Sequence, residues 1–495
     1  VKSNSTAEEN RPDFEASNRR SRDDPNFQEA STQVLNHRED NVSEEEWLDG
    51  DHGDHGIIPE FDNNQLDFGV EQFHSELHDW HKNKEGEFHQ LSTNTERILE
   101  SSLGNNESDI EAVLSLIKDW NAFLSSITSD LYSLSDFRRR NRQYPPSDFL
   151  TSITYDAAEK AESLLAHLLE KGGASLPPEV EVNAYKVSME AWSRVFHPQS
   201  GDRCETILEQ YGERFGGDMN FMPPVDAYKT VLEAHLKSCS SYSPKSEGES
   251  SGEKALGLTN LLTSLHTAGD LFLNPDLELY SLTISAVRNT LLDWQARRRF
   301  QHDETNSALE RELAAGLLGA FEQMESSLED VLGDNAGKQL SLNQWHCVIR
   351  AYADGLAPVS RIPPADDNEN TAQYLLTKLE HFISTNAVHS IDKAGLSDTD
   401  VKNLSEDIQR NLEESYTSAI SSGLILSKER GAFADFNSSL NNAVSSEEIF
   451  QRMIQRSQES PPDMGYLFPP PAPEHYLALV ESWCECVRKV SGEIM

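Results

Sequence analysis

The chain has 495 residues, and its 84 acidic side chains outnumber its 42 basic ones, which gives a formal net charge of -42. Such a surplus repels phosphate at long range, so nucleic-acid binding would require a locally basic stripe. No apolar run approaches the roughly 18 residues that cross a bilayer, and the five cysteines do not form a disulfide framework. The composition therefore excludes a helical membrane span and favours a reducing compartment.

Residues 1–68 form the first predicted region, a disordered acidic tail. They are polar and lack apolar periodicity, so they cannot bury enough surface to offset the entropy of ordering. Helical periodicity begins near Phe73, and residues 69–145 are predicted to be helices that cap the following array. One of these helices is expected from about Asp109 to Asp136.

Residues 146–495 alternate two helical patterns. In the first, an aromatic residue is followed six places later by a small one, and the copies start at Tyr185, Tyr228, Tyr280, Trp345, Tyr416 and Tyr476. In the second, a small residue is followed by apolar residues three and seven places later, with copies at Ala161, Cys204, Ala255, Ala314, Ala372 and Ser446. We call these first-type and second-type helices. Both offsets keep the named residues on one helical face, where they can pack between neighbouring helices.

Breaker residues separate these helices. Proline-containing segments at Leu176, Phe221, Leu273 and Pro469 precede first-type helices and should stop one helix and start the next. Polar composition predicts loop insertions at Ser240–Gly252, Gly355–Asn370, Ile391–Ser405 and Leu426–Ser445. Strand signals are essentially missing. The sequence therefore predicts an all-α fold, an α-solenoid of stacked antiparallel helix pairs with long loop insertions. Tyr185, Tyr228, Tyr280 and Trp345 should be buried between its units.

The alternation of these helices resembles the pentatricopeptide repeat family. The clearest instance starts at Ala158 and continues through Trp192, and the resemblance covers residues 150–290 well and 300–490 loosely. It implies a protein that binds single-stranded RNA, one base per repeat, in RNA processing, stability or translation in a mitochondrion or plastid. The acidic start of the chain is unlike an organellar transit peptide, so any such peptide is expected to be gone already.

The resemblance also implies the residues that contact RNA. The family's principal base reader directly follows the helix aromatic, and the residues at that position here are Lys186, Lys229, Ser281, His346, Thr417 and Leu477. Only Ser281 and Thr417 are of the small polar type that the family uses to bond a base, and a second reader is matched at Asp276. A cation nine places after the aromatic would reach the RNA backbone, and here these are Arg194 and Lys237. Two consecutive units thus carry cations at the same two offsets, and the resemblance implies that Lys186, Lys229, Arg194 and Lys237 lie on phosphates. Solvated helix faces are the alternative interpretation of these charges.

No motif points to catalysis. The chain has no P-loop, dinucleotide-binding or nucleophile-elbow sequence, and it lacks the C-x-x-C that a zinc deaminase needs. We therefore predict no enzyme, catalytic residue or cofactor. His74, His78 and His81 share a predicted helical face, which an exposed amphipathic helix explains better than a metal site.

A second function class stays open. The net charge favours a helical-repeat scaffold for protein–protein interaction with a basic partner, such as a ribosomal protein or a ribonucleoprotein assembly.

Overall fold

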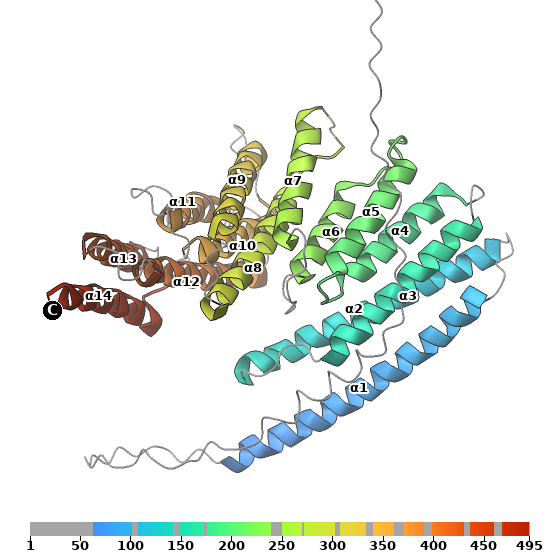
Figure 1. The fold of residues 1–495 in the computed structure, drawn as a ribbon, viewed down its shortest axis with the longest axis horizontal. Helices are drawn as coiled ribbons and strands as arrows, with labels where there is room; N and C mark the ends of the chain where they lie inside the picture. Colours follow the sequence, from blue (N-terminus) through green and yellow to red (C-terminus); the bar gives the residue numbers. More distant parts are fainter. Residues whose placement is uncertain are drawn as a thin grey trace, which may run out of the picture. The chain divides into compact units, whose positions relative to one another are not determined.

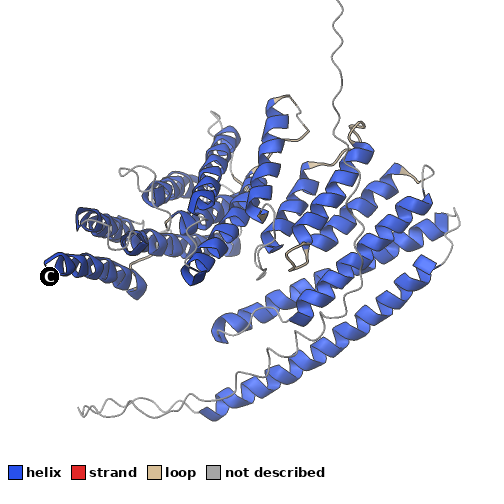
Figure 2. Ribbon diagram, viewed as in Figure 1, coloured by secondary structure: helices blue, strands red, loops and turns tan. Residues whose placement is uncertain are grey.

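A computed structural model of the chain describes residues 63–100, 107–141, 148–172, 176–238, 250–269, 272–301, 307–332, 340–360, 371–390, 398–429, 436–459 and 468–494. The chain divides into two units, residues 1–74 and 75–495. Within the described ranges the regular structure is helical and contains no strand (Figure 2), which confirms the all-α prediction. None of the described helices is long and apolar enough to cross a membrane. Residues 1–62 of the predicted tail lie outside the described residues, whereas residues 63–68 belong to the first helix, so the predicted boundary of the tail at residue 68 is wrong.

Fourteen helices are described (Figure 1). Their bounds are α1 (Asn63–Glu100), α2 (Glu107–Asn141), α3 (Asp148–Gly172), α4 (Pro178–Ser193), α5 (Ser200–Phe215), α6 (Val225–Ser238), α7 (Ser251–Thr267), α8 (Leu277–Gln301), α9 (Ser307–Leu332), α10 (Leu342–Val359), α11 (Thr371–Ser390), α12 (Asp398–Glu429), α13 (Phe436–Glu459) and α14 (Pro473–Ile494). The first-type helices are the even-numbered ones from α4 to α14, and the second-type helices are the odd-numbered ones from α3 to α13.

Local sequence signals account for where several helices begin. Each of the four predicted proline segments lies directly before a first-type helix or at its start, namely α4, α6, α8 and α14. Two other helices start with a capping box, in which Ser250 and Glu253 open α7, and Ser341 and Gln344 open α10. These side chains satisfy backbone N–H groups that have no partner within the helix.

The two helix types form two layers within residues 75–495. First-type helices contact the next first-type helix along the chain, from α4 to α14, and α2 joins the same layer. Each second-type helix except α9 packs closely against the helices that precede and follow it in the chain. Helix α9 packs closely on α8, and its Phe321 stacks on Tyr352 of α10 with ring centroids 5.4 Å apart. All extensive contacts between described helices join elements one or two places apart. This locality is the pattern that a stacked helical-repeat array would have.

The predicted packing residues form the core. The small residue and both apolar residues of every second-type copy are buried, in all six helices from α3 to α13. Of the four aromatics predicted to be buried, Tyr185, Tyr280 and Trp345 are, whereas Tyr228 is only partly buried against the core. The core has two clusters, and α8 contributes side chains to both.

The predicted loop insertions are wrong at their edges. The helical residues among them are 251–252 in α7, 355–359 in α10, 398–405 and 426–429 in α12, and 436–445 in α13. The polar composition predicts a loop at residues 398–405, although α12 has an apolar stripe in which Leu404 lies one turn before the buried Ile408. Gly355 was interpreted as a loop residue, but a side chain there would collide with the ring of Phe321 on α9. The glycine therefore permits close approach of two helices.

A recurring polar contact links three consecutive helices at each step of the array. A residue of one second-type helix bonds to the following first-type helix and to the next second-type helix, and we call each such set a junction triad. The five triads are Glu162–Trp192–Arg203, Glu205–His235–Lys254, Thr263–Tyr280–Gln323, Glu325–Tyr352–Lys378 and Glu380–Tyr416–Arg452. The sequence analysis did not find them, because their members lie on three different helices.

Candidate binding surface

Six of the seven predicted RNA-contacting residues are partly or fully exposed on the first-type helices or at their ends, and Ser281 is buried. Lys186 is exposed on α4. Arg194 follows the last residue of α4. There it donates to the Glu190 carbonyl at 2.8 Å, lies 3.7 Å from the Glu190 carboxylate and donates to the side-chain oxygen of Asn121 on α2. Arg194 therefore joins α4 to α2, whereas Lys186 points to solvent.

Lys237 joins α6 to α4 in a similar way. Its ammonium donates to the carbonyl of Ser193, at the end of α4. Burial lowers the pKa of Lys237, while the nearby charge of Glu233 acts in the opposite direction. Burial also raises the pKa of Glu233, against the charges of Lys237 and Arg194. This cation therefore has a structural contact at the position where the resemblance implied a phosphate.

Lys229 is enclosed by carboxylates of its own chain. Its Nζ atom lies 2.6 Å from Asp276, 2.8 Å from Glu278 and 3.5 Å from Asp226, and its side chain is only 14% exposed. Burial lowers the pKa of Lys229, but the hydrogen bonds and charges of Asp276 and Glu278 outweigh that effect and raise it above the usual lysine value. The positive charge is neutralised where a phosphate contact was predicted.

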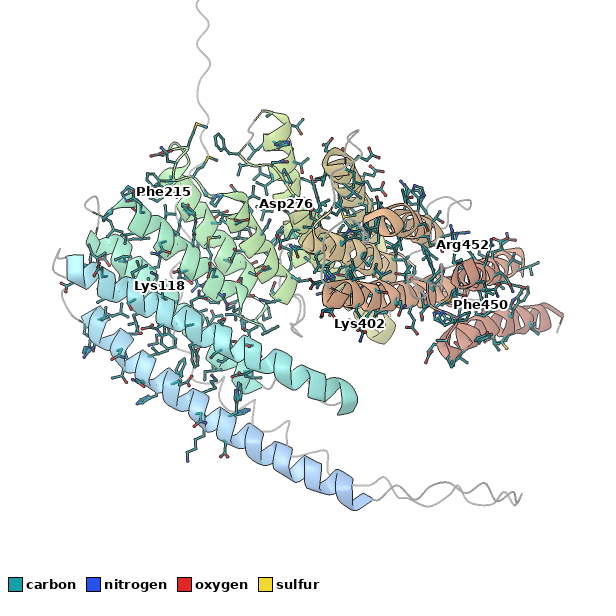
Figure 3. The ribbon with its side chains drawn as sticks, turned by 180° about the vertical axis from the view of Figure 1, so that it is seen from behind. Lys118, Phe215, Asp276, Lys402, Phe450 and Arg452 are labelled. Atoms are coloured by element: carbon teal, nitrogen blue, oxygen red, sulfur yellow. The ribbon has the colours of Figure 1, made fainter. Side chains whose placement is uncertain are left out.

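The predicted base-reading partners of these cations have structural roles too. Asp276, labelled in Figure 3, accepts a hydrogen bond from the backbone N–H of Leu279 at 3.0 Å and so caps the start of α8. Ser281, one helical turn further, is buried. The structure thus brings Asp276 and Lys229 together as an ion pair, and it places Ser281 away from the surface.

The C-terminal first-type helices continue the pattern. His346 Nδ1 on α10 lies 2.6 Å from Asp407 on α12. Thr417 on α12 donates to the Glu413 carbonyl at 2.9 Å, and its hydroxyl is 3.2 Å from His475 Nε2 on α14. Residues that directly follow the helix aromatic, here His346 and Thr417, thus bond to the next first-type helix, as Lys229 does.

These contacts form a polar ladder along the whole layer. Between α8 and α10, Asp354 accepts from Ser285 at 2.5 Å and lies 3.3 Å from Arg288. With the contacts above, each helix of this layer, from α2 to α14, is joined to the next helix of the layer by at least one bond from a side chain. The sequence could identify the positions that face this surface, but it could not show which residues of the next helix they contact.

Carboxylates dominate what the first-type helices expose. Glu179 on α4, Asp226 on α6, Glu406, Glu413 and Glu414 on α12, and Glu474 and Glu481 on α14 are exposed. Exposed cations of these helices include Lys186, Arg350, Lys402, Arg410 and Arg488. Of these, all but Lys186 have a carboxylate of the same helix within 4 Å. The surface is therefore better suited to cationic than to anionic ligands.

No metal centre is formed by the side chains that the structure describes, since no three His, Cys, Asp or Glu residues gather in a suitable arrangement. The side chains of His74 and His78 lie outside the described residues. The sequence-based prediction that the chain binds no metal or cofactor stays a prediction.

Comparison of the chain with protein-family models, curated proteins and solved structures finds no match.

Proposed function

We propose that this chain is a non-enzymatic helical-repeat protein that binds a basic protein partner along the exposed face of its first-type helices. The observation that carries the proposal is the pairing of Lys229 with three carboxylates, together with the exposed acidic residues on the same helices. A basic partner would meet carboxylates that are solvated and available. RNA would meet cations that, apart from Lys186, already contact groups of the chain.

The charge pattern predicts how such binding behaves. Complementary surface charges chiefly raise the association rate and set specificity, and salt weakens them. A fluorescently labelled Lys/Arg-rich 20-residue peptide should therefore bind the chain, with an affinity that falls as salt is added. A single-stranded oligouridine of similar length should not bind at low salt. Fluorescence anisotropy measures both.

A matched pair of variants tests where the peptide binds. Replacing Glu406, Glu413 and Glu414 on the first-type helix α12 with Gln should weaken peptide binding roughly threefold to tenfold. Replacing Glu322, Glu329 and Asp330 on the second-type helix α9 with Gln, Gln and Asn changes the net charge equally, and these side chains are also exposed. If both variants lose the same affinity, binding reflects net charge alone and the proposed face is wrong.

RNA binding is the outcome that would overturn the proposal. The resemblance to the pentatricopeptide family stays a prediction, and so does the organellar location that it implies. If the oligouridine binds, each phosphate contact should contribute about 0.7 to the slope of log affinity against log salt. Lys186→Ala is the cleanest variant for that case, because Lys186 is exposed, whereas Arg194, Lys229 and Lys237 have structural contacts.

A further inference from the structure

Helix α14 exposes an apolar stripe. Its contacts with α12 and α13 bury Ala478, Ser482 and Cys486. Elsewhere on its surface Leu477 is 60% exposed, Val480 56% and Val487 60%, and Cys484 is exposed as well. Four consecutive apolar positions on one exposed face are unusual for an acidic chain, and such faces commonly mark interaction sites.

The spacing of this stripe matches that of a coiled-coil seam. Leu477, Val480, Cys484 and Val487 follow one another at intervals of three, four and three residues, which are the a and d positions of a heptad repeat. Because a strict heptad repeat keeps one seam facing a partner helix, the stripe fits a second helix of the same spacing better than a flat surface.

Charges beside the seam indicate what that second helix is. Glu474, Glu481 and Arg488 are spaced seven residues apart and occupy the e positions. In an antiparallel pair, e positions of the two helices face each other. Two copies of α14 would therefore place Glu474 of each copy near Arg488 of the other, which gives two attractive pairs, and would place the two Glu481 side chains near each other at the centre, which gives one repulsive pair. Arg488 also lies 2.7 Å from Glu485 of its own helix and would be shared between the two carboxylates. A parallel pair would instead place the e residues near the g positions, Tyr476 and Trp483, which carry no charge.

We propose that the chain forms a homodimer in which two copies of α14 pack antiparallel along this seam. Opposing helix dipoles favour the same orientation. The interface has few layers, and small interfaces of this kind are weak, so the dimer should depend on protein concentration. The proposal is independent of the proposed function, because self-association is measured without any partner.

Sedimentation velocity over a range of concentrations tests the proposal with the full chain. The parent should shift from monomer to dimer, and Leu477→Asp/Val487→Asp should remain monomeric. Both side chains are exposed, so the variant should keep the helical circular dichroism and melting temperature of the parent. Leu261→Asp is the control, since Leu261 is similarly exposed at 51% but lies on α7, and this variant should still dimerise.

Charge reversal separates the antiparallel homodimer from other occupants of the stripe. Glu474→Arg alone would place like charges opposite each other twice and should raise the dimer dissociation constant roughly tenfold. Arg488→Glu should do the same, but it also removes a partner of the buried Glu485, so the circular dichroism and melting temperature of each variant are measured alongside. The two reversals together restore opposite charges and should restore the dimer. A parent that stays monomeric, or a double reversal that dimerises no better than the single ones, overturns the proposal. A parallel dimer would be indifferent to all three variants.

Discussion

Two junction triads occupy the same place in the array but differ in chemistry. In the Glu380 triad, a fully buried carboxylate accepts from the Tyr416 hydroxyl at 2.6 Å and lies 3.1 Å from Arg452 Nε. In the Thr263 triad, a neutral hydroxyl is 3.4 Å from both Tyr280 and Gln323. Both triads join three helices through polar side chains at this place, but only the Glu380 triad does so with an ion pair. Removing one member should lower the free energy of unfolding more in the charged triad, since a buried charge without its partner is costly.

The largest effect is expected for Glu380→Ala. Removing the carboxylate leaves the buried Tyr416 hydroxyl without its acceptor. The Arg452 guanidinium loses its charge partner, although its side chain is 26% exposed and keeps a hydrogen bond to Thr377 at 3.1 Å. The loss should be about 3 kcal/mol. Urea denaturation measures the free energy of unfolding. Glu329→Ala, at an exposed position on α9, is the control and should change it by less than about 0.5 kcal/mol. Equal effects at the two positions would contradict the role of the triad.

An intermediate effect is expected for Glu325→Ala. Its carboxylate accepts from Tyr352 at 2.7 Å and from Lys378 at 3.0 Å, but the Lys378 ammonium is partly exposed and can be hydrated when its partner is removed. We expect a loss of about 2 kcal/mol. If Glu325→Ala destabilises the chain more than Glu380→Ala, burial does not determine the cost.

The Glu205 and Glu162 triads differ in how they respond to pH. Contact with His235 lowers the pKa of Glu205, against burial and with help from Lys254. Burial instead raises the pKa of Glu162, against the charge of Arg203. A lowered carboxyl pKa gives stability that is present at pH 7 and is lost as the pH falls through the folded-state pKa. A raised pKa has the opposite effect, because stability falls as the pH rises through it.

Gln variants measure this contrast. Glu205→Gln should lose about 1 kcal/mol at pH 7, and its deficit relative to the parent should shrink at pH 4. Glu162→Gln should cost less at pH 7, because the amide resembles the neutral acid that burial favours, and its deficit should grow at pH 4. Urea titrations of the parent and both variants at the two pH values check the signs. If the stability losses of the two variants change in the same direction between pH 7 and pH 4, the opposite pKa shifts of Glu205 and Glu162 are wrong.

The smallest effect is expected for Thr263→Val. The substitution removes two long hydrogen bonds to neutral groups and one of 2.9 Å to the Thr259 carbonyl in the same helix. It keeps the shape of the side chain, so it should cost about 0.5–1 kcal/mol. Thermal denaturation of Thr263→Val and Glu380→Ala under the same conditions measures how much more the loss of the charged triad destabilises the chain than the loss of the neutral one. A loss as large as that of Glu380→Ala would mean that the neutral triad is as important as the charged one.

The sequence predicted the helix pairs well because their signals are local. The six-residue offset from aromatic to small residue and the prolines before α4, α6, α8 and α14 lie within one helix or at its start. The surface was harder to predict. Lys229 has Asp226 beside it in sequence, but its two shorter contacts are to Asp276 and Glu278, on the next first-type helix. Only the arrangement of the helices shows that this lysine is enclosed.

Tyr228 shows a further limit. It has the same pattern as Tyr185, yet it is only partly buried. Tyr185 stacks on Tyr211 of α5, with ring centroids 5.2 Å apart, and burial raises its pKa to about 12. How deeply an aromatic side chain is buried depends on the side chains of the neighbouring helix, and the six-residue pattern does not include those residues.

The locality of the helix contacts has a consequence for how the chain acquires its structure. Since extensive contacts join helices no more than two places apart, few long loops must close before native packing begins, and chains with such local contacts fold quickly. A growing polypeptide could complete each helix pair soon after it emerges from the ribosome. Under mechanical load or in denaturant, the same chain should open stepwise from an end, with α8, which is shared by both cores, among the last elements to exchange its amide protons.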